Sequence, residues 1–144
     1  MTINAASVAQ VMGGERTLGH RIGTVTELRR AMETGLPVGV LDQVVRHVTR
    51  DDRSAADLKY RIVPQTTLRR RSRLSADESQ RVERIARLIA LAEQVWEDRE
   101  LAYEFLSSAQ PQLDGERPID LARSDLGTRQ VETLLMKLEY ALPA

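Results

Sequence analysis

The side chains best suited to catalysis are few in this 144-residue chain, and their spacing does not favour a reaction centre. Cysteine is absent, and neither of the two histidines, His20 and His47, has a catalytic partner at a suitable spacing. Carboxylates occur in runs such as Asp51-Asp52, which are typical of helix caps and solvated surfaces. The Gly13-Gly14 pair lacks the following lysine and hydroxyl residue of a phosphate-binding loop. We therefore expect a binding protein with no enzymatic activity, cofactor or metal ion.

A segment at residues 64–73 has residue types and an order that suit recognition of DNA. Pro64 disfavours helical geometry in Val63 and suits the start of a new helix, so the pattern predicts a short helix, a tight turn and a second short helix. This arrangement is typical of a helix-turn-helix, in which amide and hydroxyl groups of the second helix reach base edges and arginines bind phosphates. The predicted DNA-binding residues are Gln65, Thr66, Thr67, Arg69, Arg70, Arg71 and Arg73.

Charge divides the chain into two halves of opposite sign. Residues 1–73 carry 13 basic and 7 acidic side chains, a net charge of +6, whereas residues 74–144 carry 8 and 14, a net charge of −6. A basic half can bind nucleic acid by releasing counterions from phosphates, while an acidic half is left free for a protein partner. Charged surfaces also serve solubility alone, and arginine runs are common on helices that bind no DNA. The charge pattern therefore suits two different partners without identifying either.

Helices must position these residues, and hydrophobic periodicity predicts them in the first half. Helices are expected over residues 25–34, 37–49 and 54–63, followed by the 64–73 segment. Thr26 is the expected cap of the first helix and Gly35 its stop. Glycines at four positions before residue 25 suggest that residues 1–24 form a mostly flexible arm.

The second half opens with a capping box formed by Ser75 and Glu78, which predicts a long amphipathic helix ending near Asp98. A further helix, a loop at 111–118, helical turns at 119–122 and a last helix after Gly127 are expected to follow. Three leucines of the last helix and three aromatic residues are interpreted first as core. These are Leu134, Leu135, Leu138, Trp96, Tyr103 and Phe105.

Short motifs along residues 24–142 follow an order that matches a known family. The first half contains Gly35-Leu36-Pro37, Val63-Pro64, Thr67-Leu68 and Arg70-Arg71. The junction contains Leu74-Ser75 and Glu78-Ser79, and the second half contains Phe105-Leu106, Pro111, Leu113, Gly115, Pro118, Gly127, Val131 and Glu139-Tyr140. In this combination the chain resembles the Xre/MbcA/ParS antitoxins. The resemblance implies an all-α fold with an Xre-like helix-turn-helix bundle at 25–73 and a toxin-binding helical domain at 74–144.

The resemblance also implies partners. It implies a RES-domain toxin that consumes NAD or uses it to modify a protein, operator DNA at the chain's own promoter, and a homodimer within a larger complex with the toxin. The loop after the long helices and the end of the last helix would approach and block the toxin's NAD-binding cleft. The residues so assigned are Gly115, Arg117, Pro118, Glu139, Tyr140, Ala141, Leu142, Pro143 and Ala144.

Two alternatives remain open from the sequence. One is a helix-turn-helix regulator without a toxin partner, and the other is a helical adaptor whose N-terminal helices no longer bind DNA. No stretch approaches the ~20 apolar residues of a membrane span, and the N-terminus lacks the features of a signal peptide. A cytoplasmic location, with no membrane contact, is therefore expected.

Overall fold

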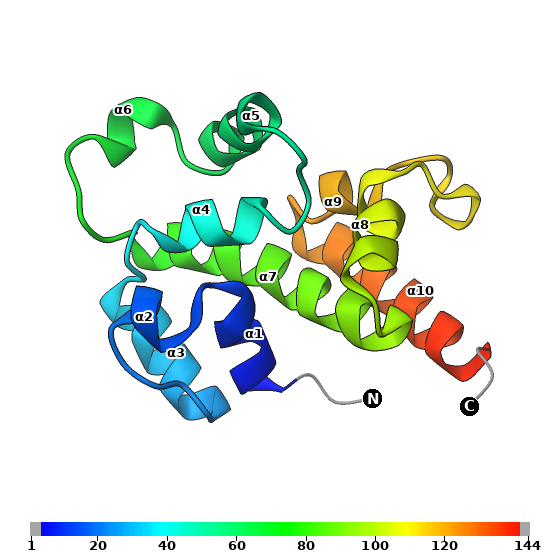
Figure 1. Ribbon diagram of the computed structural model, residues 1–144, viewed down its shortest axis with the longest axis horizontal. Helices are drawn as coiled ribbons and strands as arrows, with labels where there is room; N and C mark the ends of the chain where they lie inside the picture. Colours follow the sequence, from blue (N-terminus) through cyan, green and yellow to red (C-terminus); the bar gives the residue numbers. More distant parts are fainter. Residues whose placement is uncertain (1–3, 142–144) are drawn as a thin grey trace.

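The computed structural model describes residues 4–141, and its regular elements in that range are helices (Figure 1). In chain order they are α1 (Ala5–Val11), α2 (Gly14–Leu18), α3 (Val25–Thr34), α4 (Val40–Val45), α5 (Asp52–Ile62), α6 (Gln65–Leu68), α7 (Ala76–Trp96), α8 (Arg99–Ser107), the 3-10 helix η1 (Pro111–Leu113), α9 (Pro118–Leu121) and α10 (Asp125–Ala141). An isolated β-bridge joins Pro37 to Arg73. The all-α fold class predicted from the sequence is confirmed.

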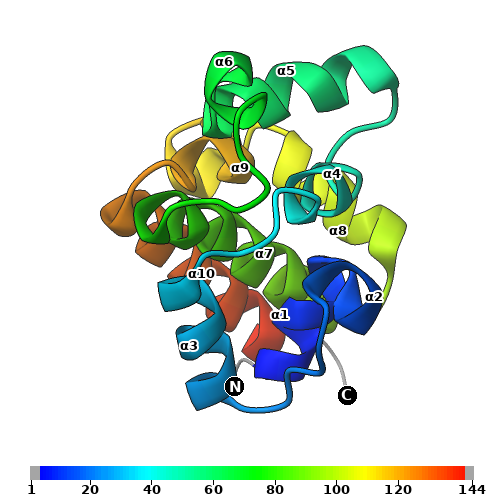
Figure 2. The same ribbon diagram turned by 90° about the vertical axis from the view of Figure 1, so that its left-hand side faces the viewer.

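The long helix α7 is the central element, and helices from both halves of the chain pack around it (Figures 1 and 2). At about 1.5 Å per residue its 21 residues span roughly 30 Å. It starts with the predicted capping box: the Ser75 hydroxyl accepts from the Glu78 amide, and the Glu78 carboxylate accepts from the Ser75 amide. Helices α1, α3, α4 and α5 pack on it from the first half, and α8 and α10 from the second.

The buried side chains of both halves form one continuous hydrophobic core. Leu36 and Leu41 from the first half are fully buried, as are Leu88 and Leu135 from the second. The predicted boundary between residues 73 and 74 lies shortly before α7, which begins at Ala76, and the core continues across it. The two halves are therefore supported by the same central helix.

The first 24 residues differ from the mostly flexible arm expected from the sequence. Helices α1 and α2 form there, and Val8 and Met12 are buried against the core at helical spacing. Gly13 and Gly19 have positive φ angles of 106° and 86° and lie at the two ends of α2. The glycines therefore delimit short helices instead of loosening the chain, because they supply the left-handed geometry that helix ends require.

Element boundaries differ from the predictions at three places. Thr24, not Thr26, caps α3 by accepting a hydrogen bond from the Glu27 amide. Asp51 caps α5, which begins two residues before the predicted Ser54. The last helix begins at Asp125, so Gly127 lies inside its first turn. There the backbone of α10 approaches the Leu121 carbonyl so closely that any Cβ would overlap with the oxygen.

Within residues 4–141, none of the helices combines the length and apolar character that crossing a membrane requires.

Candidate functional site

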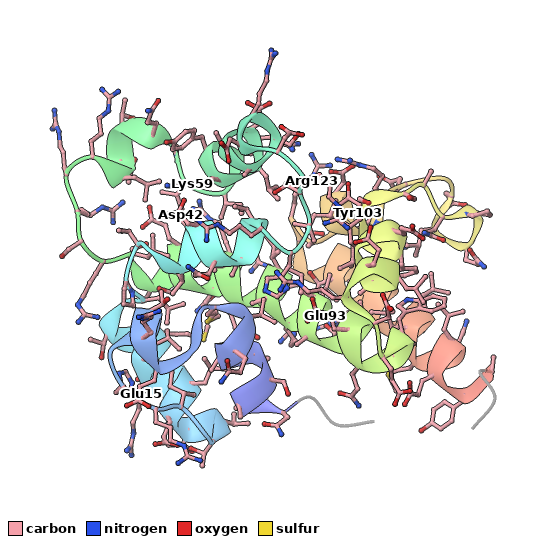
Figure 3. The ribbon with its side chains drawn as sticks, viewed as in Figure 1. Glu15, Asp42, Lys59, Glu93, Tyr103 and Arg123 are labelled. Carbon is pink, nitrogen blue, oxygen red and sulfur yellow. The ribbon has the colours of Figure 1, made fainter. Side chains whose placement is uncertain are left out.

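The predicted recognition segment consists of α5, a bend at Val63-Pro64 and the single turn α6. Lys59 binds Asp42 of α4 at 2.8 Å (Figure 3), and Ile62 is buried, so α5 is held against the core from its inner side. Val63 is extended and fully buried, and Pro64 starts α6. The α6 helix has only four residues, so it presents one turn to a partner.

The polar residues predicted to read bases lie on this turn. Gln65 and Thr66 are exposed and Thr67 is half-buried, while Leu68 packs against the core, as expected of a pivot. An exposed amide and hydroxyl on the first turn are the groups that can reach base edges. The positions of Gln65 and Thr66 thus suit the predicted role.

The four arginines after this turn fall into two pairs. Arg69 and Arg70 are exposed, and neither forms a salt bridge with another residue in the range 4–141. Arg71 donates to a Glu78 carboxylate oxygen at 2.7 Å, and Arg73 donates to the Gly35 carbonyl at 3.0 Å. The first pair is available for phosphate, whereas the second already holds the segment in place.

Backbone contacts fix the C-terminal end of the segment. Val38 donates to the Ser72 carbonyl at 3.1 Å, and Leu74 donates to the Leu36 carbonyl at 2.8 Å. Gly35 has a φ of 104°, and a Cβ there would overlap with the Leu74 carbonyl oxygen. The buried Ser79 hydroxyl accepts from the Leu36 amide at 3.0 Å. The segment is therefore tied to both the α3–α4 connection and the start of α7.

The predicted toxin-binding loop residues lie between η1 and α9. Gly115 is exposed with a φ of 80°, and a Cβ added there would meet nothing within 4 Å, so it forms an open turn. Both oxygens of Asp120 accept hydrogen bonds from Arg117, at 2.9 and 3.0 Å. These bonds raise the pKa of Arg117 and lower that of Asp120. Pro118 is buried at the first position of α9, where it shapes the helix start.

The other predicted toxin-binding residues lie at the far end of α10. Glu139 is half-buried, and Tyr140 and Ala141 are exposed. Leu142, Pro143 and Ala144 lie outside the described residues. Figures 1 and 2 show α9 beside the start of α10, and 14 residues of helix, roughly 20 Å, separate Asp125 from Glu139. The structure therefore does not gather the predicted residues into one small patch.

Sequence reasoning missed most of an outward face of α10 that carries exposed apolar side chains, because it singled out only Tyr140 there. Leu126 is 71% exposed, Met136 42% and Tyr140 77%. Leu126 lies beside Arg129, Gln130, Thr133 and Lys137 of the same helix and Gln112 and Leu113 of η1. Helical spacing places Met136 and Tyr140 on this side of the helix as well. A groove runs between this helix face and η1. The sequence pattern that could have revealed this face is a second set of apolar residues in α10, distinct from the buried Leu134 and Leu135.

Contacts between side chains far apart in the sequence join the two halves. The Arg50 guanidinium carbon lies 3.5 Å from the centre of the Tyr103 ring, and Arg50 also pairs with Glu100. His47 binds Glu93 at 2.7 Å between Nδ1 and Oε2. Tyr103 thus binds an arginine as well as packing, whereas Phe105 is buried beside Trp96, with their ring centres 6.2 Å apart.

Half-buried charges at the α7–α10 interface compensate one another. Arg87 lies 3.4 Å from a carboxylate oxygen of Glu83 and 3.4 Å from one of Glu132. Burial raises the pKa of Glu83, and the neighbouring Arg87 opposes this shift. No group of three or more histidine, aspartate or glutamate side chains within residues 4–141 is arranged to hold a metal ion.

Residues 91–141 match the family model described as the antitoxin Xre/MbcA/ParS C-terminal toxin-binding domain. This part of the chain is a toxin-binding domain of the Xre/MbcA/ParS antitoxin type. This confirms the family expected from the motif order, on a match that begins inside α7 and includes α8, η1, α9 and α10. No curated protein matches the chain.

The match places the outward face of α10 and the η1–α9 loop inside the toxin-binding domain. A toxin protein is therefore the partner of this part of the antitoxin. The first fifteen residues of α7 and all helices before it lie outside the match. They include the predicted recognition segment.

Proposed function

We propose that this chain is the antitoxin of a type II toxin–antitoxin system. It neutralises a RES-domain, NAD-consuming toxin by binding it and blocking its active site, and it represses its own operon by binding DNA. The observation that carries the antitoxin role is the match of residues 91–141 to a toxin-binding domain. The RES class of the toxin rests on the motif resemblance along residues 24–142.

The proposed toxin-binding surface is the outward face of α10, continued into its C-terminal end. Exposed apolar side chains on one helix face, bordered by polar residues, suit insertion into a groove of a partner. Leu126, Met136 and Tyr140 are the apolar side chains of this face. The mechanism is steric, and the carboxylate of Glu139 would pair with arginines that otherwise hold the phosphates of NAD.

The loop between η1 and α9 contains three further predicted toxin-binding residues, Gly115, Arg117 and Pro118. Arg117 is bound by Asp120 and Pro118 is buried, so the two residues hold the loop in shape. Gly115 is the exposed member, and it provides the turn at the tip of the loop. The loop forms a second, smaller contact with the toxin beside the main surface on α10.

The proposed DNA-binding residues are Gln65 and Thr66 for bases and Arg69 and Arg70 for phosphates. One four-residue turn gives a small interface, so useful affinity requires two copies on neighbouring half-sites. A homodimer inside the toxin complex would supply them. Arg71 and Arg73 act indirectly, by holding the segment in place.

Coexpression with the product of the adjacent reading frame tests the proposal. We expect that product to stop growth and deplete NAD when expressed alone, and to form a complex with this chain that restores growth. The double variant Met136→Glu plus Tyr140→Glu should lose protection, whereas Leu101→Glu, at an apolar side chain of α8 that is 45% exposed, should retain it.

Two outcomes separate the parts of the proposal. A harmless neighbouring product that forms no complex, together with retained promoter binding by the chain, would favour a regulator without a toxin. If Met136→Glu plus Tyr140→Glu inhibited the toxin as well as Leu101→Glu does, the toxin-binding surface would lie elsewhere on the domain.

A further inference from the structure

A cavity of about 240 Å³ lies where α5, α7 and α9 meet, and the proposed function assigns it no role. Four arginines line it: Arg61 from α5, Arg81 and Arg84 from α7, and Arg123 after α9. Apolar side chains, including Ile62 and Ile119, form the rest of its wall. Figure 3 shows Arg123 near α9, facing the region below α5.

Two of the four arginines are engaged within the protein. Arg81 donates to the Ile62 carbonyl at 3.0 Å and to Asp77 at 2.9 Å. Arg84 donates to the Arg123 carbonyl at 3.4 Å and lies 3.6 Å from Asp125, and its buried Nε has no acceptor among the described residues. These two side chains are fixed in position at the cavity wall.

The other two arginines keep most of their donors free. Arg61 donates through Nε to the Asp57 carbonyl at 3.4 Å, a long bond to a neutral group. Within residues 4–141, neither Arg61 nor Arg123 forms a salt bridge. Both are exposed at the rim, so their guanidinium groups can reach a ligand inside the cavity.

The single acidic side chain in the cavity wall, Asp120, offsets the charge of these arginines only in part. Both of its oxygens are occupied by Arg117, which does not line the cavity. The hydrogen bond from Arg117 is also the main reason that the pKa of Asp120 is lowered, followed in effect by nearby arginines including Arg61 and Arg123. The cavity is therefore positively charged at its rim and apolar in its interior.

We propose that this cavity binds a small organic phosphate, with the phosphate held by Arg61 and Arg123 and the apolar part against Ile62 and Ile119. Guanidinium groups bind phosphate oxygens in a bidentate manner, and the fixed Arg81 and Arg84 add positive potential. The volume is below the roughly 300–1,000 Å³ of sites for drug-sized ligands, so the ligand is small. Such a ligand would contact α5, which leads into the recognition segment, and α9 of the toxin-binding domain.

The test uses phenyl phosphate as the probe, with phenol and inorganic phosphate as comparisons, in calorimetric titrations of the full chain. We expect saturable binding of one phenyl phosphate per chain, weaker binding of inorganic phosphate and none of phenol. The double variant Arg61→Gln plus Arg123→Gln should weaken binding at least about tenfold, because it removes charge-assisted hydrogen bonds. The double variant Arg21→Gln plus Arg46→Gln removes the same charge from exposed sites elsewhere and should bind as the wild type does.

Circular dichroism and thermal unfolding would establish that the variants are folded, and a wild-type melting temperature that rises with phenyl phosphate would add a second readout. Equal binding by the two double variants, or equal binding of phenol, would overturn the proposal. A cavity that binds no small phosphate, while Arg61→Gln plus Arg123→Gln weakens duplex DNA binding, would also overturn it. In that case the phosphate would come from the DNA backbone.

Discussion

Arg71 donates a hydrogen bond of 2.7 Å to the side chain of Glu78, and the same carboxylate accepts a bond of 2.8 Å from the Ser75 amide. One glutamate thus completes the capping box of α7 and holds the arginine segment that follows α6. The orientation of the segment is therefore coupled to the start of the central helix. A helix cap and a candidate DNA-binding segment share one carboxylate.

Glu78→Gln should lower stability in a pH-dependent way. Burial alone would raise the pKa of Glu78, but hydrogen bonds from Ser75 and Arg71 together lower it below the ordinary value of 4.5. An acid whose pKa is lower in the folded state contributes stability above its unfolded pKa and loses it as pH falls through the folded pKa. We expect a loss of roughly 1 kcal/mol at pH 7, shrinking as the pH falls below about 4.5.

Urea unfolding at a series of pH values between 7 and 3 measures this difference. Glu104→Gln, which removes an exposed carboxylate from α8, is the matched control and should change stability little. A difference between Glu78→Gln and wild type that stayed constant over this range would show that the charge of Glu78 has no part in the effect.

Arg69→Ala plus Arg70→Ala should weaken binding to promoter DNA without lowering stability. Both side chains are exposed and available for phosphates. Losing two phosphate contacts should reduce the slope of log affinity against log salt by about 2. Fluorescence anisotropy at several salt concentrations measures the slope.

The control for DNA binding is Arg29→Ala plus Arg30→Ala on α3, which removes the same charge on another side of the molecule (Figure 1). A salt slope that falls equally in both double variants would mean that net charge alone, and no defined segment, attracts DNA.

Gly127→Ala should destabilise the protein, although alanine ordinarily favours a helix by about 1 kcal/mol over glycine. The new Cβ would overlap with the Leu121 carbonyl oxygen, a backbone atom that cannot rotate away. Overpacking costs about 1–3 kcal/mol, so we expect the clash to outweigh the helix preference. Thermal unfolding measures the net change.

Gly39→Ala provides a control of the same chemistry. Its Cβ would lie 3.6 Å from Thr17, an ordinary contact, and its φ is −61°. It should leave stability unchanged or raise it. A Gly127→Ala protein as stable as Gly39→Ala would indicate that α9 and α10 separate readily.

Met12→Ala should cost about 2–5 kcal/mol, as expected for a fully buried methionine. The residue lies just after α1, which packs on α7. Denaturant unfolding measures the loss, with the exposed Ser7→Ala as the comparison. A loss below about 0.5 kcal/mol would be the outcome expected of a flexible arm.

Much of the helical fold was predictable because it depends on local patterns. The buried positions Val40, Leu41, Val44, Val45 and Val48 follow from helical spacing, and the capping box from two residues three apart. Helices α1 and α2 were not predicted, because seven and five residues are too few to show a clear hydrophobic period. The glycines beside them are also typical of loops.

The candidate sites depend on tertiary contacts, and these are absent from local patterns. Nothing in the run Arg69–Arg71 distinguishes the exposed arginines from the one that meets Glu78, because the distinction arises at the start of α7. Similarly, an apolar residue on a helix is normally assigned to the core, so Leu126 and Met136 were overlooked. The opposite net charges of the two halves reflect surface residues. They therefore could not indicate that both halves share one hydrophobic core.

Because both halves pack around α7, each half depends on the other to stay folded and resist proteolysis. If α10 detaches, the buried face of α7 that it covers is exposed to water, and the same helix supports α1, α3 and α4. A protease that cuts the second half would therefore also release the arginine segment from its anchor at Glu78. We expect one cut to end both proposed activities, DNA binding and toxin binding, and to leave no stable fragment that performs either one.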